Sequence, residues 1–119
     1  MSNSILIYNP QCSKSKEAKK ILEDLGIEFD LIDYLQEGLS EQLISSLPHL
    51  LGLPFNKIIR EKEAIYTELK IAEKNISALD WITILRLHPV LLERPLFIFN
   101  KKAIIGRPPS LIKSFLSKN

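Results

Sequence analysis

Residues 4–26 read SILIYNPQCSKSKEAKKILEDLG, and this stretch predicts the first half of the fold. Its apolar, β-prone beginning predicts a buried strand that ends at Asn9-Pro10. After Cys12 the apolar residues recur at helical spacing, which predicts an amphipathic helix terminated by Gly26. Residues 29–34 alternate in polarity and predict a second strand. Strand, helix and strand with short connections form a βαβ unit, whose crossover we expect to be right-handed.

The middle of the chain has a different, helical character. Ser40 is a candidate N-cap, and Ser77 with Asp80 three residues later resembles a capping box. We interpret Trp81 as a core residue rather than a cofactor platform. The apolar spacing predicts helical segments over 38–54, 55–60, 64–72 and 78–87.

The last part of the chain predicts a β-hairpin and a helix. The proline at position 95 directly precedes a β-prone run at 96–99, and a polar turn at 100–102 leads to a short return strand at 103–105. A final helix is predicted over 110–116. The order β-α-β, helices, then β-β-α predicts an α/β protein of thioredoxin-like layout, a mixed sheet with a helical insertion between its two halves. We expect residues 1–119 to form a single domain.

Composition and charge exclude several classes of protein. The 119 residues are 45% hydrophobic and 25% charged, as in globular rather than disordered proteins. A net charge of +2 gives no indication of nucleic-acid binding. No apolar run approaches the roughly 20 residues that span a bilayer, so we expect no membrane span. We also expect no signal peptide, and a single cysteine favours a reducing cytoplasm.

Cys12 could be a nucleophile, a metal ligand, half of a redox pair or a small core residue. A lone cysteine with the distant His49 and His88 does not supply a tetrahedral metal site, so we expect no metal. Ser15 makes the motif Cys-x-x-Ser, which excludes a dithiol cycle within one chain. Ala18 stands where a Cys-x5-Arg phosphatase loop would have arginine. Because free N–H groups at a helix start favour a thiolate, the position of Cys12 indicates a functional thiol.

The chain has four arginines, and three of them lie at predicted element ends or in loops, where functional groups are often presented. These are Arg60, Arg94 and Arg107, whereas Arg86 lies on a predicted helix and is interpreted as a surface residue. The planar guanidinium suits tetrahedral oxyanions. On the residues alone, three separate surface ion pairs are an equally good interpretation.

Four segments together resemble the glutaredoxin-dependent arsenate reductase family, in particular its short bacterial members. The resemblance covers essentially the whole chain. Its anchors, in order along the chain, are Asn9-Pro10-Gln11-Cys12-Ser13-Lys14-Ser15, Ile59-Arg60, Glu93-Arg94-Pro95 and Ile105-Gly106-Arg107-Pro108-Pro109.

The resemblance implies a thioredoxin-like fold and an arsenate reductase. It implies that Cys12 is the nucleophile, that Arg60, Arg94 and Arg107 bind the oxyanion, and that Asn9, Ser15 and Pro95 support the site. It also implies a cis Arg94–Pro95 bond. The thiolate would attack arsenate, glutathione would serve as cosubstrate, and glutaredoxin would resolve the mixed disulfide. We expect no tightly bound cofactor and a monomer.

Two departures and two alternatives accompany this resemblance. Better-studied members have Tyr-His-Asn-Pro before the cysteine, but this chain has Ile7-Tyr8-Asn9-Pro10, so thiolate formation would depend on the helix start and the arginines. Lys16 stands where many members have arginine.

Two alternative functions remain open from the sequence. They are a glutathione-linked thiol-transfer protein and a redox regulator of the Spx type. The latter usually carries Cys-x-x-Cys, which Ser15 interrupts.

Overall fold

A computed structural model describes residues 4–119, which fall into two compact units. The sheet unit consists of the residues up to Glu37 together with Arg94–Asn119. The helical unit is the intervening segment Gly38–Glu93. The predicted insertion is therefore a compact unit of its own.

The sheet unit contains a four-stranded mixed sheet with the strand order β2-β1-β3-β4. β1 pairs in parallel with β2, with Ile5 opposite Asp30, as expected for a βαβ unit. β1 and β3 are antiparallel, with Leu6 opposite Phe97, and β3 and β4 form the predicted hairpin. The strands are β1 (Ser4–Tyr8), β2 (Asp30–Asp33), β3 (Leu96–Phe99) and β4 (Lys102–Ile105).

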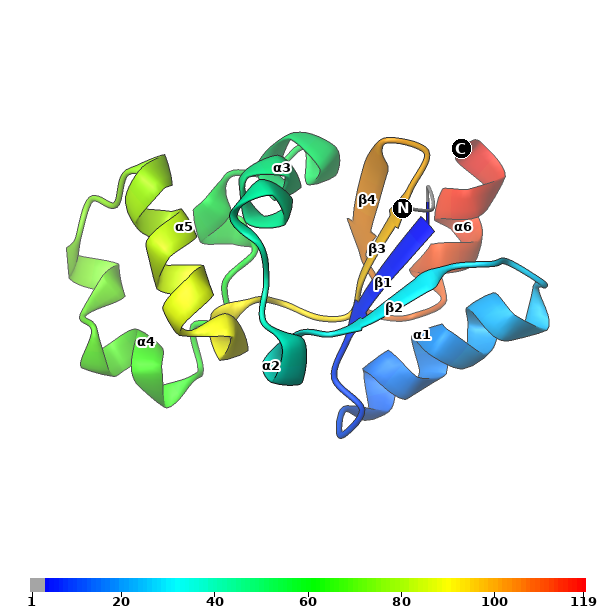
Figure 1. Ribbon diagram of the computed structural model, residues 1–119, viewed down its shortest axis with the longest axis horizontal. Helices are drawn as coiled ribbons and strands as arrows, with labels where there is room; N and C mark the ends of the chain where they lie inside the picture. Colours follow the sequence, from blue (N-terminus) through cyan, green and yellow to red (C-terminus); the bar gives the residue numbers. More distant parts are fainter. Residues whose placement is uncertain (1–3) are drawn as a thin grey trace. The chain divides into compact units, whose positions relative to one another are not determined.

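Helices α1 (Ser13–Asp24) and α6 (Leu111–Lys118) pack on one face of this sheet (Figure 1). Both helices present their apolar side to the sheet, as their spacing predicts. The backbone of Gly26 has φ 70°, which explains why α1 ends just before this glycine. The buried cluster that joins the helices to the sheet is Leu6, Ala18, Leu22, Phe97, Ile112 and Phe115.

The helical unit is built from three α-helices and three short 3₁₀ turns within Gly38–Glu93. The hydroxyl of Ser40 accepts a hydrogen bond from the Leu43 N–H at 3.1 Å, and Ser77 accepts one from Asp80 at the same distance, which confirms both predicted N-caps. Trp81 is 7% exposed and is a core residue as predicted. The elements are α3 (Glu41–Leu51), η1 (Phe55–Lys57), α4 (Ala64–Glu68), η2 (Ile71–Glu73), α5 (Ala78–Leu87) and η3 (Pro89–Leu91).

Two predicted helices of this unit are wrong in extent. The segment 55–60 is helical only as the 3₁₀ turn η1, because the β-branched Ile59 forms an antiparallel bridge with Leu92. The segment 64–72 is divided into α4 and η2, because Lys70 takes a left-handed conformation with φ 55°. In both places backbone pairing or a local turn overrides an apolar spacing that would suit a helix.

The sheet unit also departs from the sequence prediction at element ends. The second strand stops at Asp33, since Tyr34 begins the four-residue helix α2 (Tyr34–Glu37), which the sequence did not predict. The hairpin turn is made by Asn100 and Lys101, both with positive φ, so the return strand begins one residue earlier than expected. In the part of the chain that the structure describes, no helix is both long enough and apolar enough to cross a bilayer.

Candidate functional site

The turn between β1 and α1 places Cys12 at the start of the helix. Asn9 shapes this turn with its side chain and its backbone: Oδ1 accepts the Gln11 N–H at 2.9 Å, and the carbonyl oxygen accepts the Cys12 N–H at 2.9 Å. The carbonyl oxygen of Cys12 then accepts the Lys16 N–H at 3.0 Å, the first bond of the helix. Cys12 is therefore the N-cap of α1, at the start of the helix that was predicted to follow it.

The surroundings of the half-buried Cys12 thiol favour its ionised form. Partial burial raises the pKa of Cys12, but the N–H and hydroxyl of Ser15, the N–H of Lys14 and the Arg107 guanidinium outweigh it. The net result is a pKa below the ordinary value, because all of these donors stabilise the thiolate.

Ser15 supports the same turn from inside the protein. Its side chain is fully buried, and its Oγ accepts a hydrogen bond from the Asn9 N–H at 3.2 Å. The hydroxyl also lowers the pKa of Cys12. Ser15 thus joins the end of β1 to the first turn of α1 beside the sulfur, so two of the predicted supporting residues, Asn9 and Ser15, lie at the Cys12 turn.

The loop before β3 contains the predicted cis Arg94–Pro95 peptide bond, which is confirmed. The Pro95 carbonyl oxygen accepts the Gly106 N–H at 2.8 Å. A Cβ added to Gly106 would lie 3.2 Å from Pro95 Cγ and 3.2 Å from Ile112 Cδ1, so glycine permits a close approach here. Pro95, the third residue predicted to support the site, thereby packs against the segment that carries Arg107.

Arg107 is the predicted arginine that the structure brings to Cys12. Its Nη1 donates to the backbone carbonyl oxygen of Arg94 at 3.1 Å, and its guanidinium lowers the pKa of the Cys12 thiol. The Arg107–Pro108 peptide bond is also cis, a feature that the sequence did not predict. The consecutive prolines after Arg107 were the only sequence signal for an unusual backbone at this point.

Arg60 lies in the helical unit, where it is held by two carboxylates. Its Nε is 3.1 Å from Glu63 Oε2, and its Nη1 is 3.2 Å from Glu93 Oε1. The Arg60 side chain is only 20% exposed, so it is not a loose surface group. Arg86 pairs with Glu41 at 2.8 Å and is exposed, which confirms its prediction as a surface residue.

The arrangement around Cys12 combines a nucleophile with anion-stabilising donors. A thiolate at a helix N-terminus with a guanidinium beside it can attack an electrophilic centre and hold the negative charge of an oxyanion. Within residues 4–119, no group of three histidine, cysteine or acidic side chains is placed to hold a metal ion.

Comparison with known proteins places this chain in a family. A family model described as "ArsC family" matches residues 7–115. The chain is 35% identical to arsenate reductase of Haemophilus influenzae over 115 residues, which is 95% of this chain and 99% of the relative. It is also 35% identical to the uncharacterized protein YfgD of Escherichia coli over 114 residues, which is 94% and 96% of the two chains.

A solved structure agrees with the sequence comparison. Arsenate reductase from Vibrio cholerae superimposes with a TM-score of 0.88 at 34% identity, covering 93% of this chain and 95% of that one. The predicted thioredoxin-like α/β fold is thereby confirmed.

Proposed function

Because the chain belongs to the ArsC family of arsenate reductases, we propose that it reduces arsenate to arsenite with Cys12 as the nucleophile. The single observation that carries this proposal is the thiol at the N-terminus of α1, with its pKa lowered by the donors of Ser15, Lys14 and Arg107. A thiolate is the form of cysteine that attacks, and the same donors suit a tetrahedral oxyanion.

We propose that glutathione and glutaredoxin supply the reducing thiols. The Cys12 thiolate forms a sulfur–arsenic bond as one arsenate oxygen leaves as water. Reduction of pentavalent to trivalent arsenic takes two electrons, which come from the oxidation of two partner thiols to a disulfide. A second arsenic-bound oxygen leaves as water with the two thiol protons, and a water molecule then hydrolyses the sulfur–arsenic bond, which releases arsenite and the free Cys12 thiol. The single cysteine of the chain supports this scheme, since the other thiols must come from partners, and glutathione chemistry suits a reducing cytoplasm.

We propose that arginines bind the oxyanion. Arg107 has the most structural support, because its guanidinium acts on the Cys12 thiolate and its Nη1 is anchored on the Arg94 carbonyl. Arg94 is supported by its place in that anchored loop. The role of Arg60 rests on the family resemblance, and its two carboxylate partners, Glu63 and Glu93, would keep its guanidinium oriented.

The activity is tested by arsenate-dependent consumption of NADPH in the presence of glutathione, glutaredoxin and glutathione reductase. We expect turnover with the native chain and none above background with Cys12→Ser. Absence of turnover in the native chain would contradict the proposal. Deglutathionylation of a mixed disulfide is measured in parallel, since the same low-pKa thiol would serve a thiol-transfer protein, and that activity alone would replace arsenate reduction as the function.

The arginine assignment is tested by anion affinity. Substitution of Arg60, Arg94 or Arg107 by alanine should weaken arsenate binding roughly tenfold, as expected for the loss of one charge-assisted hydrogen bond. Arg86→Ala is the matched control, because Arg86 is an exposed arginine paired with Glu41. Equal effects of all four substitutions would show that the arginines act only through net charge.

A further inference from the structure

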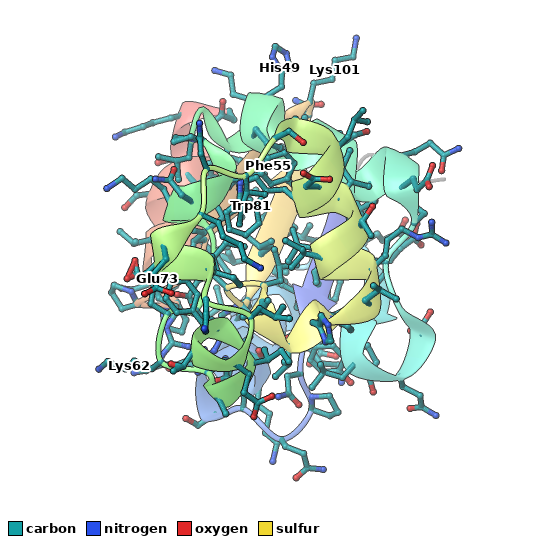
Figure 2. The ribbon with its side chains drawn as sticks, turned by 90° about the vertical axis from the view of Figure 1, so that its left-hand side faces the viewer. His49, Phe55, Lys62, Glu73, Trp81 and Lys101 are labelled. Carbon is teal, nitrogen blue, oxygen red and sulfur yellow. The ribbon has the colours of Figure 1, made fainter. Side chains whose placement is uncertain are left out.

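An open cavity of about 710 Å³ lies within the helical unit, among side chains from Ser45 to Trp81. This volume is in the range of about 300–1,000 Å³ found for small-molecule sites. One part of its wall is apolar and aromatic. The rings of Phe55 and Trp81 stack with centroids 6.2 Å apart and an interplanar angle of 23°, and Figure 2 shows the two residues side by side in this unit. Both are more than nine-tenths buried, so the wall is held in place by packing.

The charged residues that line the cavity give it a positive excess. Lys57 and Lys74 line it, and Glu61 is its acidic lining residue. Both lysines are exposed, and among residues 4–119 neither lies within ion-pair distance of a carboxylate. Two lysines that line the same cavity as an aromatic pair would attract an anion that also has an apolar body.

We propose that this cavity binds a small aromatic carboxylate, with its ring against Phe55 and Trp81 and its carboxylate between Lys57 and Lys74. An inorganic anion would leave the aromatic wall unused, and an uncharged apolar molecule would gain nothing from the two lysines. All lining residues belong to the helical unit, so this site is independent of the Cys12 chemistry proposed above.

The protein carries its own reporter for this site, because Trp81 is the single tryptophan of the chain. Titration of the full chain with β-naphthoate, followed by tryptophan fluorescence, should give a saturable change. The neutral amide β-naphthamide has the same ring without the charge, and it should bind more weakly. No saturable change with β-naphthoate up to millimolar concentration would overturn the proposal.

Charge substitutions test the role of the lysines. Lys57→Gln and Lys74→Gln should each raise the Kd for β-naphthoate about threefold, as expected for an exposed ion pair. Glu61→Gln removes an opposing charge and should lower the Kd about twofold. Lys62→Gln is the matched control, because this exposed lysine is next to Glu61 in the chain but does not line the cavity.

A general loss of folding cannot raise the Kd for β-naphthoate in the lysine variants and lower it in the glutamate variant. Circular dichroism checks independently that each variant is folded. Binding of β-naphthamide should be the same in all four variants, since it carries no charge. Equal affinity for the carboxylate and the amide, or a β-naphthoate Kd unchanged by both lysine substitutions, would overturn the proposal.

Discussion

Nη1 of Arg107 donates a hydrogen bond to the backbone carbonyl oxygen of Arg94 at 3.1 Å. The preceding residue reinforces this contact, because the Gly106 N–H donates to the Pro95 carbonyl oxygen at 2.8 Å. Two consecutive residues after β4 are thus bonded to two consecutive residues before β3. The connection fixes Arg107 in the region where its guanidinium stabilises the Cys12 thiolate.

The Cys12 thiol should titrate below the free cysteine value of about 8.5. Arg107→Ala should raise its pKa, because the lost positive charge stabilised the thiolate, so alkylation at a fixed pH below the pKa becomes slower. The measurement is the rate of iodoacetamide alkylation as a function of pH, with Arg86→Ala as the control. If the alkylation rate of the native protein reaches half of its maximum at a pH equal to or above the pKa of free cysteine, this prediction is contradicted.

Ser15→Ala should affect both the thiol and the fold. Loss of the hydroxyl raises the pKa of Cys12 at least as far as Arg107→Ala does, since the Ser15 side chain is the larger of the two contributions. It also leaves the Asn9 N–H without its acceptor, which should cost about 1 kcal/mol of unfolding free energy. Urea denaturation measures this cost. Ser13→Ala, at an exposed position of the same turn, is the control, and an equal loss in both variants would argue against the role of Ser15.

The features of the fold and of the candidate site that the sequence predicted depend on short-range patterns. Asn9-Pro10 ends an apolar run, and helical spacing follows Cys12, so both the strand–turn–helix order and the position of Cys12 at the helix start could be predicted locally. The caps at Ser40 and Ser77 were predicted for the same reason, because the hydroxyl bonds a backbone N–H three residues away.

The parts that the sequence could not predict depend on contacts between distant residues. Arg60 and Glu93 form an ion pair across 33 positions, and no local pattern selects Glu93 as the partner. The bridge between Ile59 and Leu92 likewise replaces a predicted helix with extended backbone. The cavity beside Phe55 and Trp81 is lined by residues from several short elements. The apolar spacing of these elements predicted which residues are buried, but not that a cavity forms between them.

Gly106→Ala should destabilise the loop around Pro95. The new Cβ would lie 3.2 Å from both Pro95 Cγ and Ile112 Cδ1, and relief of this crowding should cost about 1 kcal/mol or more. Ile112→Val removes the Cδ1 atom, so the double variant should lose less stability than the sum of the two single variants. Urea denaturation of all four proteins measures this coupling. Strict additivity would mean that the glycine is not required by packing against Ile112.

Glu93→Gln should destabilise the helical unit more than Glu41→Gln does. The Arg86–Glu41 pair is shorter, 2.8 Å against 3.2 Å for Arg60–Glu93, so distance alone predicts the reverse order. The Arg60 and Glu93 side chains, however, are only 20% and 26% exposed, whereas those of Arg86 and Glu41 are 53% and 65% exposed. Water and salt screen the exposed pair, so we expect a loss of about 1 kcal/mol for Glu93→Gln and less than about 0.5 kcal/mol for Glu41→Gln. The measurement is urea denaturation at low and high salt. High salt should abolish the loss of stability in Glu41→Gln but not the loss in Glu93→Gln. A larger loss for Glu41→Gln would show that distance outweighs burial in this unit.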